Sequence, residues 1–378
     1  MDIIKVLIVD DSSLIRDIIR ESLSHSHHIK VVGEAEDPLV ARDLIKKLNP
    51  DVLTLDVEMP KMDGITFLIN LMRLRPMPVI MISTLTTKGA DITLQALEIG
   101  ALDFIAKPTV QELMATQDSF KEVLIEKIIQ AVKVDQKNFK LSDTLANNRA
   151  SNKVTKNTFN FLPFGGVKRA NHLIVLGAST GGTEAIKKLL ITLPSNSPAI
   201  VITQHIPKIF SLRFAQRLNE NCQMEVHEAS HGQKIKNGNV YIAPGDKHLK
   251  VVHKNGSLFC TLSDSDEVNR HRPAVDVLFN SVSSLADNLQ VILLTGMGQD
   301  GAQGMLRLKT LGARTLIQDK NSSLIWGMPG KAHAISAHTI ELPLIKIAKN
   351  ILDYASLNRA EMKDVLAKSC TGGPICIK

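Results

Sequence analysis

Residues 5–11 read Lys-Val-Leu-Ile-Val-Asp-Asp, a short apolar run that ends in two aspartates. Similar apolar runs recur along the first part of the chain, and amphipathic stretches separate them. We expect strands at 5–9, 29–34, 52–56, 79–83 and 101–105, and helices at 12–24, 38–48, 65–75, 90–99 and 120–134. This alternation predicts an α/β domain in which five βα units form a doubly wound parallel sheet with helices on both faces.

The same alternation resumes at residue 173 and continues to residue 354. We expect strands at 173–176, 200–204, 240–243, 258–262, 291–295 and 315–318. Helices are expected at 182–193, 209–219, 274–285, 301–311 and 344–354. The pattern predicts a second doubly wound, mostly parallel α/β domain.

The stretch between these two patterns is rich in Asn, Lys, Ser and Thr, and it carries six of the seven net positive charges. Such a segment buries too little apolar surface to offset its ordering entropy. We therefore expect domains at 1–132 and 170–360, joined by a basic polar linker at 133–169. The apolar patch at 159–164 is expected to dock on one of the domains. Because the charge is confined to the linker, nucleic acid is not an expected partner.

The composition indicates the cellular location of the protein and the redox state of its cysteines. Apolar residues make up 44% of the chain, and no apolar run reaches the roughly 18 residues of a membrane helix. The first residues lack the basic-then-apolar pattern of a signal peptide. We therefore expect a cytoplasmic protein with no direct membrane insertion. The cysteines form no Cys-x-x-Cys pair and no cluster with zinc spacing, so reduced thiols are expected at Cys222, Cys260, Cys370 and Cys376.

Charged and hydroxyl side chains stand at the ends of the expected strands of the first domain: Asp10, Asp11, Asp56, Ser83 and Lys107. The carboxyl ends of parallel strands converge on one edge of a sheet, so these side chains are expected to meet. Three clustered carboxylates repel one another, and a hard divalent cation such as Mg²⁺ resolves that repulsion. Asp56, between this metal and Lys107, is then a candidate phosphoryl acceptor. Ser83 can hydrogen-bond the phosphoryl group once it is attached.

These residues resemble the receiver domain of two-component response regulators. The resemblance covers roughly residues 1–125, and its motifs are Val9-Asp10-Asp11, Leu55-Asp56-Val57-Glu58-Met59-Pro60, Asp63-Gly64 and Lys107-Pro108. It implies that Asp56 is phosphorylated and that Ser83 and Lys107 support the reaction. It also implies a Mg²⁺ ion held by the Glu58 backbone carbonyl together with the carboxylates of Asp10, Asp11 and Asp56.

The second domain opens on Gly177-Ala178-Ser179-Thr180-Gly181, the Gly-x-Ser-x-Gly turn that exposes a serine hydroxyl between a strand and a helix. His205 follows the next strand, and Asp300 follows the strand at 291–295. A nucleophile, a base and an orienting carboxylate are thus expected at one sheet edge. Their order along the chain differs from that of α/β-hydrolases. Backbone amides near the serine turn, with that of Met297, would hold an oxyanion.

Several alternatives stay open on these residues alone. His271 is a rival to His205 as the base. Asp246 and Asp276 are rivals to Asp300, although Asp276 lies in a helical pattern and is expected to face solvent. A glycine-rich turn after a strand can also cradle phosphate, which would indicate a nucleotide-binding output domain. The basic linker is the one feature that favours a DNA-binding output.

Five motifs of the second domain resemble the chemotaxis protein-glutamate methylesterase/protein-glutamine glutaminase family. They are Gly-Ala-Ser-Thr-Gly-Gly (177–182), Thr-Gln-His (203–205), Tyr-Ile-Ala-Pro-Gly-Asp-Lys-His (241–248), Asn-Arg-His-Arg-Pro (269–273) and Thr-Gly-Met-Gly-Gln-Asp-Gly (295–301). The resemblance implies Ser179 as nucleophile, His205 as base and Asp300 as orienting carboxylate. This mechanism needs no catalytic metal, so no cofactor is expected in this domain. It implies hydrolysis of glutamate methyl esters and deamidation of glutamines on methyl-accepting chemotaxis receptors, activated by phosphorylation. The phosphodonor would be the histidine kinase of the pathway.

Overall fold

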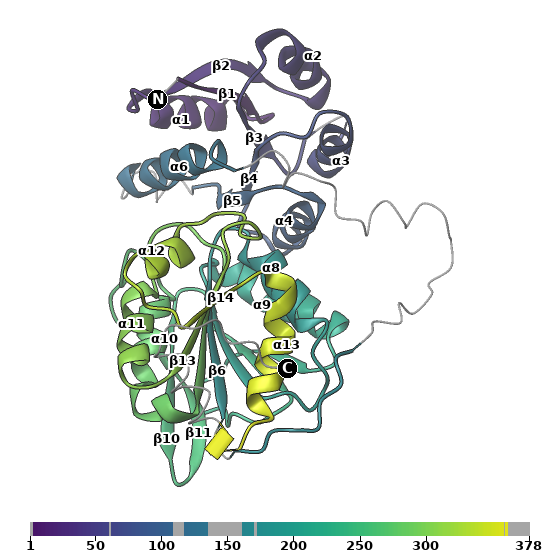
Figure 1. The fold of residues 1–378 in the computed structure, drawn as a ribbon. Helices are drawn as coiled ribbons and strands as arrows, with labels where there is room; N and C mark the ends of the chain where they lie inside the picture. The colour runs from purple at the N-terminus through teal and green to yellow at the C-terminus, as the bar shows by residue number, and fades with distance from the viewer. Residues whose placement is uncertain are drawn as a thin grey trace, which may run out of the picture. The chain divides into compact units, whose positions relative to one another are not determined.

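The computed structural model describes residues 3–59, 62–108, 117–134, 161–169, 172–358 and 360–361 of the 378-residue chain. The chain divides into two compact units, Met1–Lys156 and Asn157–Lys378, and each has its own sheet (Figure 1). Among the described residues, no helix is both long and apolar enough to cross a membrane.

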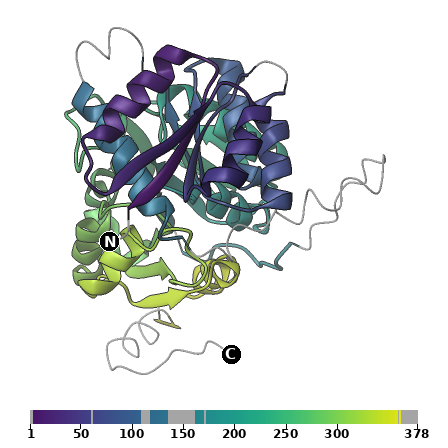
Figure 2. The same ribbon diagram turned by 90° about the horizontal axis from the view of Figure 1, so that it is seen from above.

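The first unit is a five-stranded parallel sheet with strand order β2-β1-β3-β4-β5. The strands are β1 (Ile4–Val9), β2 (Ile29–Ala35), β3 (Val52–Asp56), β4 (Val79–Ser83) and β5 (Asp103–Ala106). The helices are α1 (Ser13–Ser24), α2 (Pro38–Leu48), α3 (Gly64–Leu74), α4 (Thr87–Ile99) and α6 (Gln117–Ala131). Helices lie on both sides of the sheet (Figure 2), where α1 packs beside α6 and α3 beside α4. The doubly wound parallel fold expected from the sequence is confirmed.

Burial and helix capping explain why these residues form these elements. Every residue of β3 and β4 is buried, as expected for central parallel strands that are covered on both faces. The first four helices begin at side chains that accept hydrogen bonds from backbone amides of the first turn, namely Ser12, Asp37, Asp63 and Thr86. Asp63, which belongs to one of the receiver-like motifs, thus caps α3.

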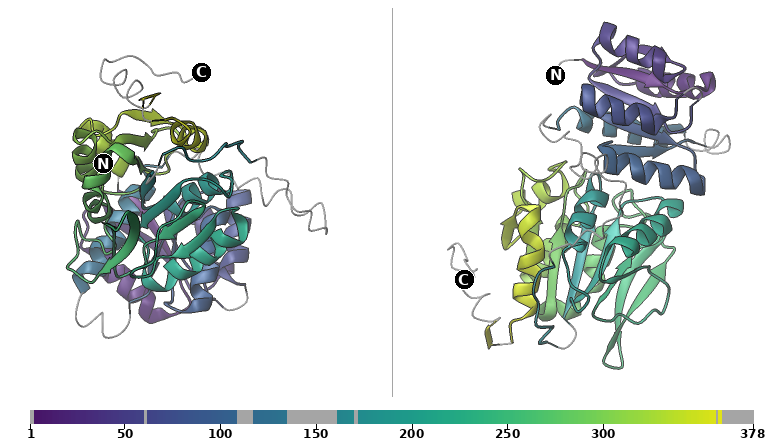
Figure 3. Two further views of the ribbon diagram at one scale, coloured as in Figure 1. Left: turned by 90° about the horizontal axis from the view of Figure 1, so that it is seen from below. Right: turned by 90° about the vertical axis from the view of Figure 1, so that its right-hand side faces the viewer.

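The second unit is built on a seven-stranded parallel sheet with strand order β14-β13-β12-β6-β7-β9-β8 (Figures 1 and 3). The strands are β6 (Leu173–Ala178), β7 (Ala199–Gln204), β8 (Glu225–Glu228), β9 (Asn239–Ile242), β12 (Leu289–Leu293), β13 (Arg314–Gln318) and β14 (Ile340–Leu342). An antiparallel hairpin is formed by β10 (His248–Lys254) and β11 (Ser257–Ser263). The helices are α8 (Gly182–Leu190), α9 (Lys208–Asn221), α10 (Val275–Ser281), the 3-10 helix η2 (Ser283–Asn288), α11 (Ala302–Thr310), α12 (Met328–Ala334) and α13 (Leu344–Ala355).

Some elements of the second unit differ from the sequence-based expectation. The helix expected at 274–285 is α10 followed by η2. The strand expected at 258–262 lies in the β10–β11 hairpin and not in the main sheet. Strands β8, β10 and β14 and helix α12 were not expected. The three strands lie at the edges of the sheet or in the hairpin and include exposed residues, so they lack the continuous apolar run by which the buried strands were recognised. Helix α12, with seven residues, is too short to define a helical period.

The central strand β6 marks the point where the strand order reverses. Strand β7, the next strand along the chain, pairs with one edge of β6. Strand β12, which comes much later in the sequence, pairs with the other edge of β6. Open α/β sheets bind ligands outside the carboxyl ends of the strands at such a point. The topology therefore indicates where the functional residues of this unit should lie.

Residues 161–169, the last described part of the expected linker, pack on the second unit. The backbone amide of Leu162 donates to the carbonyl of Thr192 at 3.2 Å. The side-chain amide of Asn196 donates to the carbonyl of Phe164 at 3.2 Å. Positions 159 and 160 of the apolar patch lie outside the described residues. Because of these contacts, we propose that the second domain begins before residue 161 and that the linker is correspondingly shorter.

A buried basic cluster lies at the amino ends of the strands of the second sheet. His172, which is 3% exposed, has its Nδ1 3.1 Å from Nη2 of Arg169 and its Nε2 3.0 Å from Nε2 of Gln290. The guanidinium carbons of Arg169 and Arg314 lie 4.6 and 4.3 Å from the centre of the Tyr354 ring. Burial, followed by the charge of Arg169, lowers the pKa of His172 to about 3, so the imidazole is neutral in the folded protein.

We predict that His172 destabilises the second unit in acid. The unfolded chain protonates this histidine below its ordinary pKa of 6.5, whereas the folded protein does so only near pH 3. Its stabilising contribution is therefore complete above pH 6.5 and is lost as the pH falls toward 3. Between about pH 8 and about pH 5, the free energy of unfolding should fall by about 2 kcal/mol from this residue alone. Urea unfolding followed by the fluorescence of Trp326, the single tryptophan of the chain, measures this loss.

The comparison is between the wild-type chain and His172→Gln, whose side chain does not titrate. The variant should lose less stability between the two pH values, whatever its stability at pH 8. His253→Gln, at an exposed position of β10, serves as the matched control and should keep the wild-type dependence. An unchanged pH dependence in His172→Gln would show that other groups cause the acid sensitivity.

Candidate functional site

The carboxyl edge of the first sheet gathers three aspartates and a lysine. Asp10 directly follows β1, Asp56 ends β3 and Lys107 directly follows β5. Nζ of Lys107 lies 2.9 Å from Oδ2 of Asp10 and 2.9 Å from Oδ2 of Asp56. Ligand oxygens of Asp10, Asp11 and Asp56 all lie within 4.8 Å of one another. The structure thus brings together four of the side chains that the sequence predicted at this edge.

Burial makes the negative charge of this cluster unfavourable. Asp10 is 0% exposed and Asp56 is 2% exposed. Burial, followed by the charge of Asp10, raises the pKa of Asp56 to about 6, and burial also raises the pKa of Asp10. Burial alone would lower the pKa of Lys107, but its contacts with the two carboxylates outweigh this effect and raise it. One ammonium therefore offsets only part of the negative charge, and a further cation would stabilise the site.

The donor set of this cluster fits a magnesium ion. Mg²⁺ prefers hard oxygen ligands and usually keeps several of its waters. Asp10 and Asp56 offer buried carboxylates, whereas Asp11 is exposed, so a partly hydrated ion can be reached from solvent on that side. The carboxylates of the three aspartates could hold the ion. The ammonium of Lys107, which contacts Asp10 and Asp56, is a second positive charge beside the same carboxylates.

Glu58 and Ser83, the other residues predicted at this edge, make different contacts. The backbone amide of Glu58 donates to Oδ1 of Asp56 at 3.4 Å, and its carboxylate lies 3.8 Å from Nζ of Lys88. The buried hydroxyl of Ser83 donates to the carbonyl of Gly89 at 3.4 Å. To donate to a phosphoryl group on Asp56, the Ser83 hydroxyl would have to give up this bond. The predicted metal contact of Glu58 involves its backbone carbonyl, so it does not require the side chain to join the cluster.

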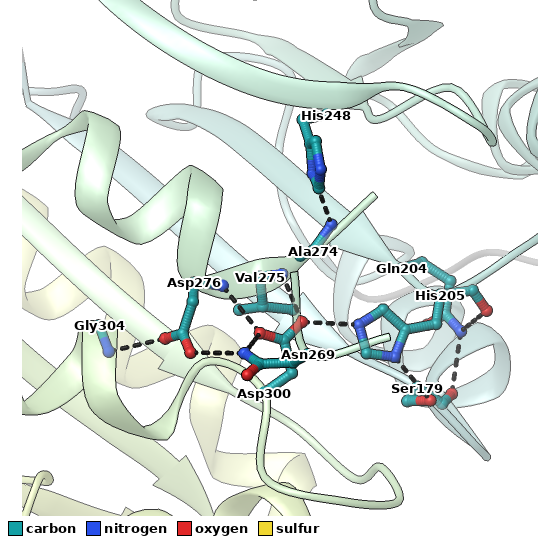
Figure 4. Close-up of polar contacts among 10 residues, drawn as sticks. All are labelled: Ser179, Gln204, His205, His248, Asn269, Ala274, Val275, Asp276, Asp300 and Gly304. Atoms are coloured by element: carbon teal, nitrogen blue, oxygen red, sulfur yellow. Dashed lines mark hydrogen bonds and ion pairs between the residues drawn. The ribbon is translucent and has the colours of Figure 1, made fainter. Parts of the chain in front are cut away.

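A serine, a histidine and an aspartate meet at the carboxyl edge of the second sheet (Figure 4). Ser179 directly follows β6, His205 directly follows β7 and Asp300 lies in the loop after β12. Nδ1 of His205 lies 3.1 Å from Oγ of Ser179, and its Nε2 lies 2.9 Å from Oδ2 of Asp300. Because a carboxylate only accepts, Nε2 carries the proton and Nδ1 accepts from the serine hydroxyl. This is the geometry of a nucleophile, a base and an orienting carboxylate.

Asp300 is held as a buried anion by several N–H donors. It is 2% exposed, and besides His205 its donors are the backbone amides of Val275 (2.6 Å) and Asp276 (3.1 Å) and the side-chain amide of Asn269 (2.7 Å). Burial alone would raise the pKa of Asp300, but these hydrogen bonds, that of His205 foremost, lower it to about 2. A carboxylate that stays ionised keeps the Nε2–H of His205 in place.

Asn269 and Asp276 form a further layer behind Asp300 that the sequence did not reveal (Figure 4). Nδ2 of Asn269 donates to Oδ1 of Asp300 at 2.7 Å and to Oδ2 of Asp276 at 2.8 Å. Oδ1 of Asp276 accepts from the amide of Gly304 at 2.7 Å. Burial raises the pKa of Asp276, which is 8% exposed.

The expectation that Asp276 faces solvent was therefore wrong. Helix α10 is seven residues long, so its residue pattern is too short to define a buried face. Asn269 also takes a left-handed backbone with φ of 55°, a conformation that asparagine tolerates better than most residues. In the sequence, the available signal for a special role of Asn269 was its place in the Asn-Arg-His-Arg-Pro motif. The structure adds that the next residue, Arg270, also has a positive φ, of 65°.

The rival residues occupy other places around this network. The ring of His271 stacks on that of His205, with ring centroids 3.6 Å apart and an interplanar angle of 19°. Asp246 pairs with Arg272, whose Nη2 lies 2.8 Å from Oδ1 of the aspartate. The geometry favours His205 as the base and Asp300 as its orienting partner. His271 packs on the face of the base, where it limits the tilt of the ring.

Close packing fixes the turn that carries Ser179. Gly181 takes a left-handed φ of 75°, and α8 begins at the next residue, Gly182. A Cβ on Gly182 would lie 2.2 Å from Oε1 of Gln204, so a side chain does not fit there. Nε2 of Gln204 in turn donates to the carbonyl of Ser179 at 2.9 Å. The sequence identified the serine and its glycines, but not the support from Gln204.

The loop that contains Met297 lies beside this serine. A Cβ on Gly296 would be 2.9 Å from Cβ of Ser179, and the amide of Ser179 donates to the carbonyl of Thr295 at 3.1 Å. The amide of Gly182 is engaged with the carbonyl of Ser179 at 2.7 Å. Donors to an oxyanion must therefore come from other amides of the turn and this loop. The role of the Met297 amide stays a prediction.

We predict that removing the Asn269 side chain slows the reaction of Ser179 with a serine-directed fluorophosphonate. Asn269→Gly keeps the left-handed backbone accessible but removes a donor from the buried Asp300 carboxylate. Losing one such bond costs about 1–3 kcal/mol, so labelling should slow by about 5- to 150-fold. The labelling rate is read by mass spectrometry of the intact chain.

Asn255→Gly is the matched control, because Asn255 has a similar φ of 51° in the exposed turn of the β10–β11 hairpin. It should label at the wild-type rate. Wild-type labelling of Asn269→Gly would mean that the Asp300 carboxylate is oriented without this donor.

Known proteins provide an independent comparison. Residues 6–117 match the family model of the response regulator receiver domain, and residues 174–351 match that of the CheB methylesterase. The chain is 49% identical over 372 residues to the protein-glutamate methylesterase/protein-glutamine glutaminase of Hydrogenovibrio crunogenus, covering 93% of this chain and 99% of the relative. It is 46% identical over 359 residues to protein-glutamate methylesterase/protein-glutamine glutaminase 1 of Xanthomonas campestris pv. campestris, covering 94% and 98%.

Among solved structures, the chain is similar to the CheB methylesterase catalytic domain of Thermotoga maritima, with 35% identity, 49% of this chain and 99% of that chain covered, and a TM-score of 0.48. The two curated relatives are matched along nearly their whole length, through the receiver domain and the methylesterase domain alike. The chain therefore belongs to the protein-glutamate methylesterase/protein-glutamine glutaminase family.

Proposed function

We propose that this chain hydrolyses glutamate methyl esters and deamidates glutamines on methyl-accepting chemotaxis receptors, and that phosphorylation of Asp56 activates it. The observation that carries the proposal is the hydrogen-bonded chain from Ser179 through His205 to Asp300. The names of the relatives support the substrate class. The phosphodonor would be the histidine kinase of the chemotaxis pathway, and the reaction would take place in the cytoplasm.

The first half-reaction is acyl transfer to the serine. Nδ1 of His205 takes the proton of the Ser179 hydroxyl while Oγ attacks the carbonyl carbon of the glutamyl ester or amide. The bond to the leaving group then breaks, and methanol or ammonia departs with the proton that His205 had accepted. The product is an acyl-enzyme on Ser179. Throughout, Asp300 holds the Nε2–H and stabilises the imidazolium.

The second half-reaction releases the glutamate. A water molecule gives a proton to Nδ1 of His205 and attacks the acyl carbon, and the bond to Oγ of Ser179 breaks. The serine recovers its proton from His205, so the enzyme returns to its starting state. In both halves the carbonyl oxygen becomes an anion, and preorganised backbone amides stabilise it. We assign one of them to Met297 because its loop lies beside the serine.

The receiver domain would control this reaction through Asp56. A bound Mg²⁺ ion would neutralise charge on the transferring phosphoryl group. Asp10, Asp11, Asp56 and the backbone carbonyl of Glu58 would hold the ion, and the Lys107 ammonium, 2.9 Å from Asp56, would bind a phosphoryl oxygen. The raised pKa of Asp56 indicates a carboxylate that its surroundings stabilise poorly, which suits a nucleophile better than a structural anion.

We predict that Ser179→Ala abolishes methanol release from methylated receptor membranes without unfolding the protein. The substitution removes the attacking oxygen from a small side chain, so kcat/KM should fall by about 10⁴- to 10⁶-fold. His205→Ala should be comparably inactive, whereas His271→Ala should retain measurable turnover because it packs on the base without replacing it. Methanol release is assayed under identical conditions for the three variants.

The Trp326 fluorescence of each variant checks that the second unit is folded. A Ser179→Ala chain with more than about a tenth of wild-type turnover would remove this serine from the mechanism. If His271→Ala were the inactive histidine variant and His205→Ala the active one, the assignment of the base would be reversed.

We predict that a small-molecule phosphodonor with Mg²⁺ stimulates methanol release by the full-length chain, and that Asp56→Asn does not respond. The amide of asparagine cannot accept the phosphoryl group, although it keeps the shape of the side chain. We infer that the unphosphorylated receiver domain holds the catalytic unit inactive, so a fragment comprising residues 157–378 should be active without the phosphodonor. Because it lacks Asp56, it should not respond to the phosphodonor.

Asp51→Asn is the matched control, since this exposed aspartate precedes β3 and lies outside the acidic cluster. It should respond as the wild type does. Stimulation of Asp56→Asn to the wild-type extent would contradict the assignment of the phosphorylated residue. A folded but inactive 157–378 fragment would mean that the receiver domain is needed to form a competent catalytic unit.

A further inference from the structure

Two histidines and a glutamate gather at the C-terminal end of α12, outside the network of Ser179. One ligand atom of each of His333, His338 and Glu341 lies within 4.8 Å of those of the other two. Nδ1 of His333 lies 2.9 Å from Oε2 of Glu341. The rings of His333 and His338 stack, with centroids 5.0 Å apart and an interplanar angle of 17°. The proposed reaction gives these three side chains no role.

The end of α12 fixes the arrangement of the two histidines. The amide of Ala337 donates to the carbonyl of Ala332 at 2.8 Å, and the amide of Ser336 donates to the carbonyl of His333 at 2.9 Å. With Ser336 at a left-handed φ of 56°, these bonds form a Schellman closure of the helix. The closure turns the chain back on the last helical turn, which brings His338 beside His333.

The local chemistry suits a transition metal. Two imidazoles and a carboxylate are the ligands that Zn²⁺ and Co²⁺ take in proteins. Burial, followed by the charge of His333, lowers the pKa of His338, so its ring is neutral at neutral pH. Within the described part of the chain, Nδ1 of His338 is buried and makes no hydrogen bond. The ring also has a backbone hydrogen bond with Ala332, so Nδ1 is the nitrogen that has no partner among the described residues.

We propose that His333, His338 and Glu341 form a binding site for a divalent transition-metal ion, with zinc as the best fit. Tetrahedral zinc needs donor atoms about 3.3 Å apart, so the 2.9 Å contact between His333 and Glu341 must lengthen, and the two stacked rings must turn until each directs a nitrogen at the ion. The side chains of His333 and Glu341 are 55% and 31% exposed and are free to make this movement. Water would complete the coordination.

Lys309 sets a limit on the affinity of this site. Its Nζ donates to the carbonyls of Ser336 and His338 at 2.7 and 2.9 Å, which braces the turn. Its positive charge also opposes a second cation nearby, and Glu341 supplies a single negative charge. We therefore expect micromolar rather than nanomolar dissociation constants.

The single tryptophan provides a local probe of this site. The Trp326 ring centroid lies 6.1 Å from that of His333. A Co²⁺ ion bound by the histidines would quench its fluorescence, and Zn²⁺, which does not absorb visible light, would reverse the quenching by competition. The experiment uses the full-length chain with excess Mg²⁺ to occupy the acidic cluster of the receiver domain. We expect saturable quenching by one equivalent of Co²⁺ at micromolar concentrations.

His333→Gln and His338→Gln should each weaken Co²⁺ binding at least tenfold, and Glu341→Gln should weaken it less. His333→Gln changes an exposed side chain, and an unchanged thermal midpoint without metal will show that it folds. His253→Gln and the double variant Cys370→Ser/Cys376→Ser should bind as the wild type does. Unaltered quenching in His333→Gln and His338→Gln, or no saturable quenching of the wild type below millimolar Co²⁺, would overturn the proposal.

Discussion

The hydrogen bonds that converge on the Asp300 carboxylate constrain several segments of the catalytic unit at once. The donors come from the end of β7, from a left-handed turn and from the first turn of α10. These segments must meet within hydrogen-bonding distance of one buried anion. A displaced segment would leave part of a buried charge without a donor, which is strongly destabilising. The geometry of the base and the stability of the unit therefore depend on the same carboxylate.

Asp56 and Asp300 show how different surroundings shift the pKa of the same type of side chain in opposite directions. Both are 2% exposed, so burial disfavours the charged form of each. The pKa of Asp56 nevertheless rises to about 6, while that of Asp300 falls to about 2. Asp300 receives several N–H donors, whereas Asp56 faces a second buried carboxylate and shares one lysine with it. A well-satisfied anion orients a base, and a poorly satisfied one is suited to accept a phosphoryl group and to recruit a cation.

Much of this arrangement could be predicted from the sequence because strand ends are easy to recognise. The central strands β3 and β4 occupy the expected positions, since buried parallel strands are continuous apolar runs. A polar residue that follows such a run must lie at the carboxyl edge, which correctly grouped Asp10, Asp56 and Lys107 in one unit and Ser179, His205 and Asp300 in the other. Strand β14 escaped prediction because it is a partly exposed edge strand without a continuous apolar run, and helix α12 because seven residues do not define a helical period.

The sequence by itself determined two parallel sheets and the set of side chains at their active edges. Only the tertiary structure decided how those side chains are paired. It turned Asp276 inward, bound Asn269 between two carboxylates and directed Nε2 of His205 to Asp300, 95 residues further along the chain. It also packed Arg169, which had been expected in the linker, against the carbonyl of Tyr354, 185 residues away. Local patterns report burial and periodicity within an element, whereas these pairings depend on distances between segments that meet only after the chain has folded.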